Sequence, residues 1–184
     1  QLKPIRRPPR RQPPVRNRVK SRVTASTHKK VAVFLLDGAC EPGYINPAAL
    51  DSVEKIDLLT PGGEHRSIPL NEVKAVCFVR EFTGPFEPER KSFLSRPKLD
   101  GLWIRLRFRD NDEMEGVAAN DLLAMLGLGV QLTPPDLHGN VVRMFIPRSA
   151  LVEMKVLGVV GVARRPQPKP SGGRSADQPE LFDE

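Results

Sequence analysis

The feature of this sequence that most limits its possible folds is an internal repeat. The stretch VAVFLLDG, which begins at Val31, returns as IRLRFRDN from Ile104, 73 residues further on. The same offset aligns further pairs along the two copies, namely Asp37 with Asp110, Gly43 with Gly116 and Thr60 with Thr133. A later Ile-Pro pair aligns only at an offset of 78, because the second copy has five extra residues in a turn. Insertions confined to turns indicate that one folding unit has been duplicated.

Each copy has the pattern of a short all-β unit. Ile104, Leu106 and Phe108 alternate with polar positions, and this period of two predicts a strand with one buried face. Asp37-Gly38 is a turn sequence that would connect the first strand of its copy to the next. Gly43 follows where a strongly bent strand needs a residue without a side chain. Three more strands are expected in each copy, with one or two helical turns at 121–127.

The composition changes sharply at both ends of the repeated part. Residues 1–30 are rich in Pro and Arg, and residues 163–184 are rich in Pro, Gly and Ser. Neither segment can bury enough apolar surface to offset the entropy of ordering, so both are predicted to be disordered. We therefore predict an all-β protein with two tandem five-stranded barrels, divided into a basic arm (1–30), a first barrel (31–80), a connector (81–102), a second barrel (103–162) and a tail (163–184).

The opening of the first copy, V-x-V-x-L-x-D-G-x-x-x-x-G-x-I, resembles the first signature of Sm-like proteins, which have small SH3-like barrels. The resemblance covers 31–79 and 103–160 and implies the barrel fold and binding to uridine-rich RNA. Asn46 lies in a loop where Sm-like proteins contact a base, but the late Arg-Gly or Lys-His motif of the family is absent. The resemblance thus extends to the fold and not to the RNA pocket. The chain, above all at 93–103, also looks like a bacterial family of uncharacterised proteins.

Positive charge is concentrated at the start of the chain. Residues 1–30 contain 11 of the 29 Lys and Arg residues and no acid, which leaves 18 basic against 22 acidic residues, a net charge of −4, in the rest. Such an arm either binds nucleic-acid phosphates with release of counterions or is a solvated linker. The candidate contacts are Arg6, Arg7, Arg10, Arg11, Arg16, Arg18, Lys20 and Arg22.

The arm also has the arginine spacing of PilZ domains, which bind cyclic di-GMP. Arg6 and Arg10 are four residues apart, as are Arg7 and Arg11. The second motif of that family, D/N-x-S-x-x-G, does not follow them. A PilZ-like receptor for cyclic di-GMP is therefore a lesser alternative.

One face of the second copy offers another candidate contact surface. Trp103, Arg105, Arg107 and Arg109 share one face of the predicted strand, with successive side chains about 7 Å apart. Guanidinium groups in this arrangement can follow a phosphate backbone while an indole stacks on a base. Alternatively, Glu113 and Glu115 on the neighbouring strand pair with the arginines and neutralise them.

No pattern typical of catalysis or of a cofactor is present. The three histidines are scattered, and the acidic cluster that starts at Asp110 lacks the spacing of a calcium loop, so a solvated hairpin is expected there. Cys40 and Cys77 lack a zinc motif and are expected to be buried reduced thiols, with a disulfide as the alternative. We predict a protein without enzymatic activity, cofactor, metal or membrane span, located in the cytoplasm.

The end of the chain contains a further motif. The sequence QPELF resembles the Q-x-x-L-F peptide with which bacterial replication and repair proteins bind the sliding clamp, although Pro179 replaces the usual leucine. The contact residues would be Gln178, Leu181 and Phe182, and a chance match is the alternative. We predict a non-catalytic protein that binds nucleic acid, RNA in particular, through the basic arm and the second barrel. The main alternative is a protein-interaction adaptor.

Overall fold

The computed structural model describes residues 27–50 and 54–161. Ten strands dominate this part of the chain, and the one α-helix within it is four residues long. The predicted all-β class is therefore confirmed. Within the described residues, no helix has the length and apolar character needed to cross a membrane.

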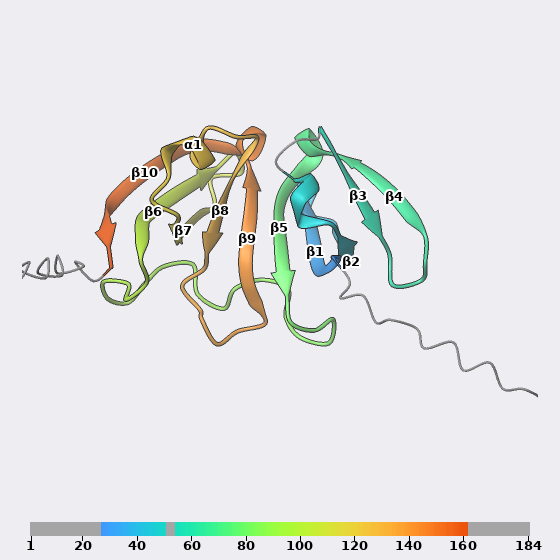
Figure 1. Ribbon diagram of the computed structural model, residues 1–184, viewed down its shortest axis with the longest axis horizontal. Coiled ribbons are helices and arrows are strands. Elements are labelled where there is room, and N and C mark those ends of the chain that lie inside the picture. Colours follow the sequence, from blue (N-terminus) through green and yellow to red (C-terminus); the bar gives the residue numbers. More distant parts are fainter. Residues whose placement is uncertain (1–26, 51–53, 162–184) are drawn as a thin grey trace, which may run out of the picture.

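The same order of elements occurs twice along the chain (Figure 1). We call residues 29–79 the first repeat, and its elements are β1 (Lys29–Leu35), β2 (Cys40–Ile45), the 3₁₀ turn η1 (Pro47–Ala49), β3 (Lys55–Leu59), β4 (His65–Pro69), η2 (Leu70–Glu72) and β5 (Val73–Val79). We call residues 101–160 the second repeat, and its elements are β6 (Gly101–Phe108), β7 (Glu113–Ala118), α1 (Leu122–Met125), β8 (Gly129–Thr133), β9 (Val141–Pro147), η3 (Arg148–Ala150) and β10 (Leu151–Val160).

All ten strands belong to one antiparallel sheet, in the order β10-β6-β7-β8-β9-β5-β1-β2-β3-β4. The repeats form two curved lobes that meet in the centre of Figure 1, where β5 pairs with β9. Among the described residues, strand pairing does not close either repeat on itself, and β4 and β10 are the two free edges. The expectation of two closed barrels is thus not confirmed, because the pairing that would close them is replaced by a continuous open sheet.

The first hairpin of each repeat is built in the same way. Oδ1 of Asp37 accepts a hydrogen bond from the amide two residues further on at 2.9 Å, and Oδ1 of Asp110 does the same at 3.1 Å. The next residue has a positive φ in both hairpins, 91° at Gly38 and 63° at Asn111. Glycine and asparagine are the residues that tolerate this conformation best. The sequence offset of 73 therefore aligns equivalent turns.

A glycine allows the second strand of each repeat to bend closely over the third. A Cβ atom added at Gly43 would lie 2.6 Å from Cδ1 of Leu58, and one added at Gly116 would lie 2.6 Å from Cδ1 of Leu132. Both distances are shorter than any ordinary contact between carbon atoms. The close approach of these strands thus requires a residue without a side chain at both positions.

The two repeats share their apolar cores. Phe145 on β9 is 0% exposed and packs in the core cluster of the first repeat, beside Val33 and Val76. In the opposite direction, Ala75 and Cys77 on β5 belong to the core cluster of the second repeat. Because neighbouring residues of a strand point to opposite faces, the β5–β9 pair contributes side chains to both clusters. Burial of these side chains couples the two repeats.

Candidate functional site

The first three residues of the predicted arginine ladder lie on β6, on the face opposite to the core, and Arg109 follows the end of the strand. Ile104 and Leu106 are both 0% exposed and Phe108 is 2% exposed, so the alternation predicted from the sequence is confirmed. Trp103 and Arg107 are half-buried on the other face, and the remaining arginines are exposed. The structure therefore places Trp103, Arg105 and Arg107 along one strand, and Arg109 in the turn directly after it.

The buried carboxylate of Glu115 on β7 neutralises the first part of the ladder. It accepts hydrogen bonds from Nε and Nη2 of Arg105 at 3.2 and 2.8 Å, and from Nε1 of Trp103 at 3.1 Å. The backbone amide of Phe93 in the connector donates a further bond at 3.1 Å. Burial alone would raise the pKa of Glu115, but these hydrogen bonds outweigh burial and lower it. The charged carboxylate thus fastens the connector to the second repeat.

The rest of the ladder is only partly paired. Nε of Arg107 lies 3.3 Å from a carboxylate oxygen of Glu153 on β10, although the β6–β7 register places Glu113 opposite Arg107. Within the described part of the chain, Arg109 has no ion pair. Sequence reasoning missed Glu153, because β10 is separated from β6 by most of a repeat and becomes its neighbour only in the sheet. Trp103, Arg105 and Arg107 therefore take part in contacts within the fold.

Several predicted contact residues lie outside the described residues. These are the arm residues Arg6, Arg7, Arg10, Arg11, Arg16, Arg18, Lys20 and Arg22, and the C-terminal residues Gln178, Leu181 and Phe182. Asn46, the loop residue suggested by the Sm-like resemblance, caps η1 by accepting a hydrogen bond from the amide of Ala48 at 3.2 Å. Asn46 thus has a structural role at this turn.

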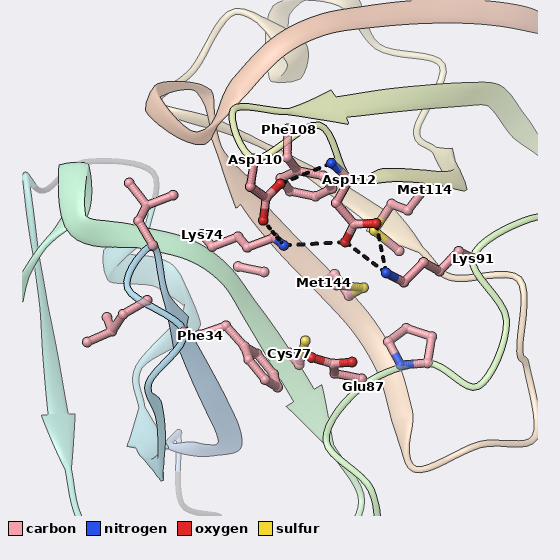
Figure 2. Close-up of a pocket in the computed structure, with 15 residues that line it drawn as sticks. Phe34, Lys74, Cys77, Glu87, Lys91, Phe108, Asp110, Asp112, Met114 and Met144 are labelled. Atoms are coloured by element: carbon pink, nitrogen blue, oxygen red, sulfur yellow. Dashed lines mark hydrogen bonds and ion pairs between the residues drawn. The ribbon is translucent and has the colours of Figure 1, made fainter.

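A pocket of about 150 Å³ lies between the two repeats (Figure 2). One side of it is apolar and the other side carries paired charges. The labelled residues that line it are Phe34, Lys74, Cys77, Glu87, Lys91, Phe108, Asp110, Asp112, Met114 and Met144. The pocket draws on both repeats and the connector, so no single stretch of the sequence predicts it.

The polar wall of the pocket is an ion-pair network. Nζ of Lys74 lies 2.5 Å from Asp110 and 3.3 Å from Asp112, and Nζ of Lys91 lies 2.7 Å from Asp112. The hydrogen bond from Lys74 is the main cause of the lowered pKa of Asp110. Burial would raise the pKa of Asp112, but hydrogen bonds from Lys91 and Lys74 lower it. The hairpin is solvent-exposed as expected, with the Asp110 side chain 50% exposed, and two ammonium groups in addition pair with its carboxylates.

The two thiols do not have the properties of activated nucleophiles. Cys77 is buried in the pocket, and desolvation strongly raises its pKa. Cys40 is exposed, which corrects the expectation that it is buried; partial desolvation and the charges of Glu87 and Glu41 raise its pKa. Both cysteines are free, so the disulfide alternative is not realised in this structure. At neutral pH both groups are thiols, whereas nucleophilic attack requires a thiolate.

A basic and aromatic surface lies where the arm joins the sheet. Nζ of Lys30 on β1 lies 5.8 Å from the ring centroid of Phe82 and donates a hydrogen bond to the carbonyl of Arg80 at 3.3 Å. The ring of Phe82 packs edge-on against Tyr44 on β2, with 5.3 Å between centroids. We call Lys29, Lys30, Tyr44, Arg80 and Phe82 the arm-base surface.

The cations of the arm-base surface differ from those of the ladder in their partners. The guanidinium of Arg80 donates to the backbone carbonyls of Gly139 and Leu137, at 3.1 and 3.4 Å. Among the described residues, Lys29, Lys30 and Arg80 form no ion pair, so no carboxylate neutralises them. Sequence reasoning missed this surface. The signal that was available is the β1–β2 hairpin, whose register places Lys30 opposite Tyr44.

The fold defines a duplicated all-β protein whose two repeats share one open sheet. The chain belongs to DUF6982, a family of unknown function, whose model matches residues 27–158 and so spans both repeats. This agrees with the resemblance to an uncharacterised family and does not support the Sm-like or SH3-like classification. Comparison with curated proteins and with solved structures gave no match.

Proposed function

We propose that this protein binds single-stranded nucleic acid, RNA in particular, without catalysis, through its basic arm and the arm-base surface. The observation that carries the proposal is the difference between two sets of cations. Lys29, Lys30 and Arg80 have no carboxylate partner among the described residues, whereas Arg105 and Arg107 are paired with Glu115 and Glu153.

The distribution of charge supports this assignment. Residues 1–26 contain nine Lys and Arg residues and no acid. The described residues contain 16 basic and 17 acidic residues, a net charge of −1. Attraction of a polyanion therefore comes from the arm, and the three cations at its base extend the positive charge onto the folded part.

The aromatic rings favour a single-stranded ligand. Tyr44 and Phe82 are half-exposed and lie against Lys30, although Phe82 also packs against the core of the second repeat, so a base can stack on the exposed part of these rings while the ammonium group approaches its phosphate. Stacking of this kind contributes about 1–3 kcal/mol per base and tolerates any sequence. A duplex keeps its bases stacked on each other and cannot use this contribution.

The second repeat has a smaller part in this proposal than the sequence suggested. Glu115 already compensates the charge of Arg105 through hydrogen bonds to Nε and Nη2, so this arginine attracts a phosphate less than an unpaired cation would. Arg109 is the ladder residue available for contact. The Sm-like relationship also belongs to the proposal, and it is supported by the equivalent hairpins and the glycine bend in each repeat.

Fluorescence anisotropy with a labelled 20-nucleotide RNA, the matching single-stranded DNA and a duplex tests the proposal. We expect the single strands to bind more tightly than the duplex, with affinity that falls steeply between 50 and 200 mM salt, because bound phosphates release counterions. Deletion of residues 1–26 should abolish most of this binding. Absence of salt-dependent binding to any of the three probes would contradict the proposal.

Point variants separate the arm-base surface from general charge. Phe82→Ala and Lys30→Ala should each weaken binding of the single strands by about tenfold. Lys55→Ala is the matched control, because Lys55 is also an exposed cation but lies on β3, outside the surface. An equal loss in Lys55→Ala and Lys30→Ala would show that the surface has no specific role.

A further inference from the structure

The edge strand β10 is unusually apolar for a strand that ends a sheet. It is ten residues long, and its exposed fractions include 55% at Val152, 39% at Met154, 56% at Val156 and 59% at Val159. Within the described part of the chain it pairs only with β6. An edge of this kind presents unpaired backbone groups and apolar side chains, and natural proteins normally cover or charge such edges.

The first repeat shows what covers the equivalent strand. The offset of 78 makes β5 the counterpart of β10 and aligns Val76 with Met154. Val76 is 0% exposed, because β9 lies beside β5 and places Phe145 opposite Val76. Met154 keeps its exposure because no described strand lies on that side of β10. The position thus has room for one further antiparallel strand.

We propose that β10 pairs antiparallel with β10 of a second copy of this chain, about a two-fold axis at Met154. This register places Met154 opposite itself, in the regular part of β10 between two bulges, and brings Val156 next to Val152 of the other copy, which lies in the bulge before Glu153. It also places Glu153 opposite Lys155 of the other copy, twice per interface, which extends the 3.1 Å ion pair that these two residues form within one chain. Apolar and opposite-charge cross-strand pairs both stabilise a sheet, and the pairing would join two ten-stranded sheets into one of twenty strands.

The charges select this register over its neighbours. Residues that face each other across an antiparallel pair have side chains on the same face of the sheet. A two-fold axis perpendicular to the sheet keeps this rule only if one residue faces its own copy, so each possible register is defined by that residue. An axis at Glu153 or at Lys155 would bring like charges together. At the other end of the strand, the carbonyl of Val159 already accepts a hydrogen bond from Arg96 at 2.7 Å. The free edge is therefore centred near Met154.

The other free edge of the sheet is a poorer partner for β10. Within one chain, β5 pairs with β9. The counterpart of β5 is β10 and the counterpart of β9 is β4, so the same arrangement between two chains would pair β10 of one chain with β4 of the next. The equivalent register places Ser67 opposite Met154 and Arg66 opposite Lys155. A polar residue then faces an apolar one and two cations face each other, which is unfavourable. A two-fold interface also closes, whereas a head-to-tail one produces rings or fibres.

Disulfide crosslinking of the full-length chain tests the register. In a Cys40→Ala background, Met154→Cys should form a covalent dimer on mild oxidation, because facing Cα atoms about 4.5–5.5 Å apart are within the range of a disulfide. Val159→Cys is the matched control. In this register residue 159 lies ten positions from its own copy along the strand, about 33 Å away, so no crosslink is expected.

Light scattering on the same chain tests the interface without relying on disulfide geometry. We expect a dimer that Val156→Lys converts to monomer, whereas Val142→Lys, at a 46% exposed valine on the interior strand β9, leaves it dimeric. Glu153→Lys should weaken dimerisation by about tenfold by opposing lysines, and the double variant Glu153→Lys/Lys155→Glu should restore it.

Two results would overturn the proposal. One is a monomer at all concentrations up to about 1 mM, where even a weak specific association is visible. The other is an oligomer that Lys155→Glu alone strengthens, because that change favours pairing with Arg66 and so identifies β4 as the partner. Circular dichroism of each variant checks that the fold is kept, so that loss of the dimer reports on the edge.

Discussion

Nζ of Lys74 lies 2.5 Å from Oδ2 of Asp110, and this ion pair joins the last strand of the first repeat to the first hairpin of the second. The counterparts of these residues in the duplicated pattern are Val152 and Asp37. Val152 is uncharged, so the equivalent ion pair between β10 and the first hairpin of the first repeat cannot form. An aspartate that closes a turn in both repeats has thus acquired a second role in one of them.

The first prediction concerns this second role. Asp110→Asn keeps an oxygen that can accept the turn hydrogen bond but removes the charge that faces Lys74. We expect a loss of about 1 kcal/mol in the free energy of unfolding, measured with urea, since the pair is partly buried. Asp37→Asn is the matched control and should change stability by less than about half of that amount. Equal losses would mean that the ion pair does not contribute.

The second prediction is a dependence of stability on acid. The pKa values of Asp110, Asp112 and Glu115 are lowered in the folded protein. Their stabilising contribution is therefore present above the unfolded pKa values of about 4 and is lost as the pH falls through the folded values. The urea concentration at the unfolding midpoint should decrease as the pH is lowered below about 4. In the double variant Asp110→Asn/Asp112→Asn this decrease should be smaller. An unchanged slope would contradict the role of the network.

The third prediction concerns the bent strands. Gly116→Ala would place a Cβ atom 2.6 Å from Cδ1 of Leu132 and 3.1 Å from the carbonyl oxygen of Thr133, so the buried Leu132 side chain must move and β8 must shift by a few tenths of an ångström. We expect a loss of about 1–3 kcal/mol by urea unfolding, the range for overpacked positions. Gly158→Ala is the control, because a Cβ atom there has nothing within 4 Å and φ is not positive. Similar stabilities of the two variants would argue against the close crossing.

The fourth prediction concerns the shared cores. Phe145→Ala empties a fully buried site in the first repeat's cluster although the residue lies in the second repeat. A loss of about 3–5 kcal/mol is expected. Trp103 fluorescence, which reports on the second repeat alone, should follow the same transition as circular dichroism. Separate transitions for the two signals would mean that the repeats unfold independently.

Local features of the fold could be predicted from the sequence because they depend on neighbouring residues. The alternation of Ile104, Leu106 and Phe108 identified a strand and its buried face. The aligned Asp37 and Asp110 identified equivalent turns, and the expected helical segment at 121–127 contains α1. In each case the physical cause lies within a few residues of the pattern.

The arrangement of the repeats and the partners of the ladder could not be predicted in this way. Pairing of β5 with β9 replaced the closure of each repeat, and it depends on a fit between two distant strands. Glu153 reaches Arg107 only because β10 lies beside β6. The arm-base surface likewise combines β1, β2 and the start of the connector. Periodicity within one stretch contains no information about such distant neighbours.

The sharing of Phe145 has a consequence for the ancestry of the chain. One copy of a duplicated module can be deleted only while the remaining copy can fold by itself. Phe145 of the second copy fills the interior of the first, so deletion of the second copy leaves a cavity in the first, and deletion of the first copy leaves Phe145 uncovered. A substitution at a buried position of β5 or β9 therefore changes the packing of both repeats at once.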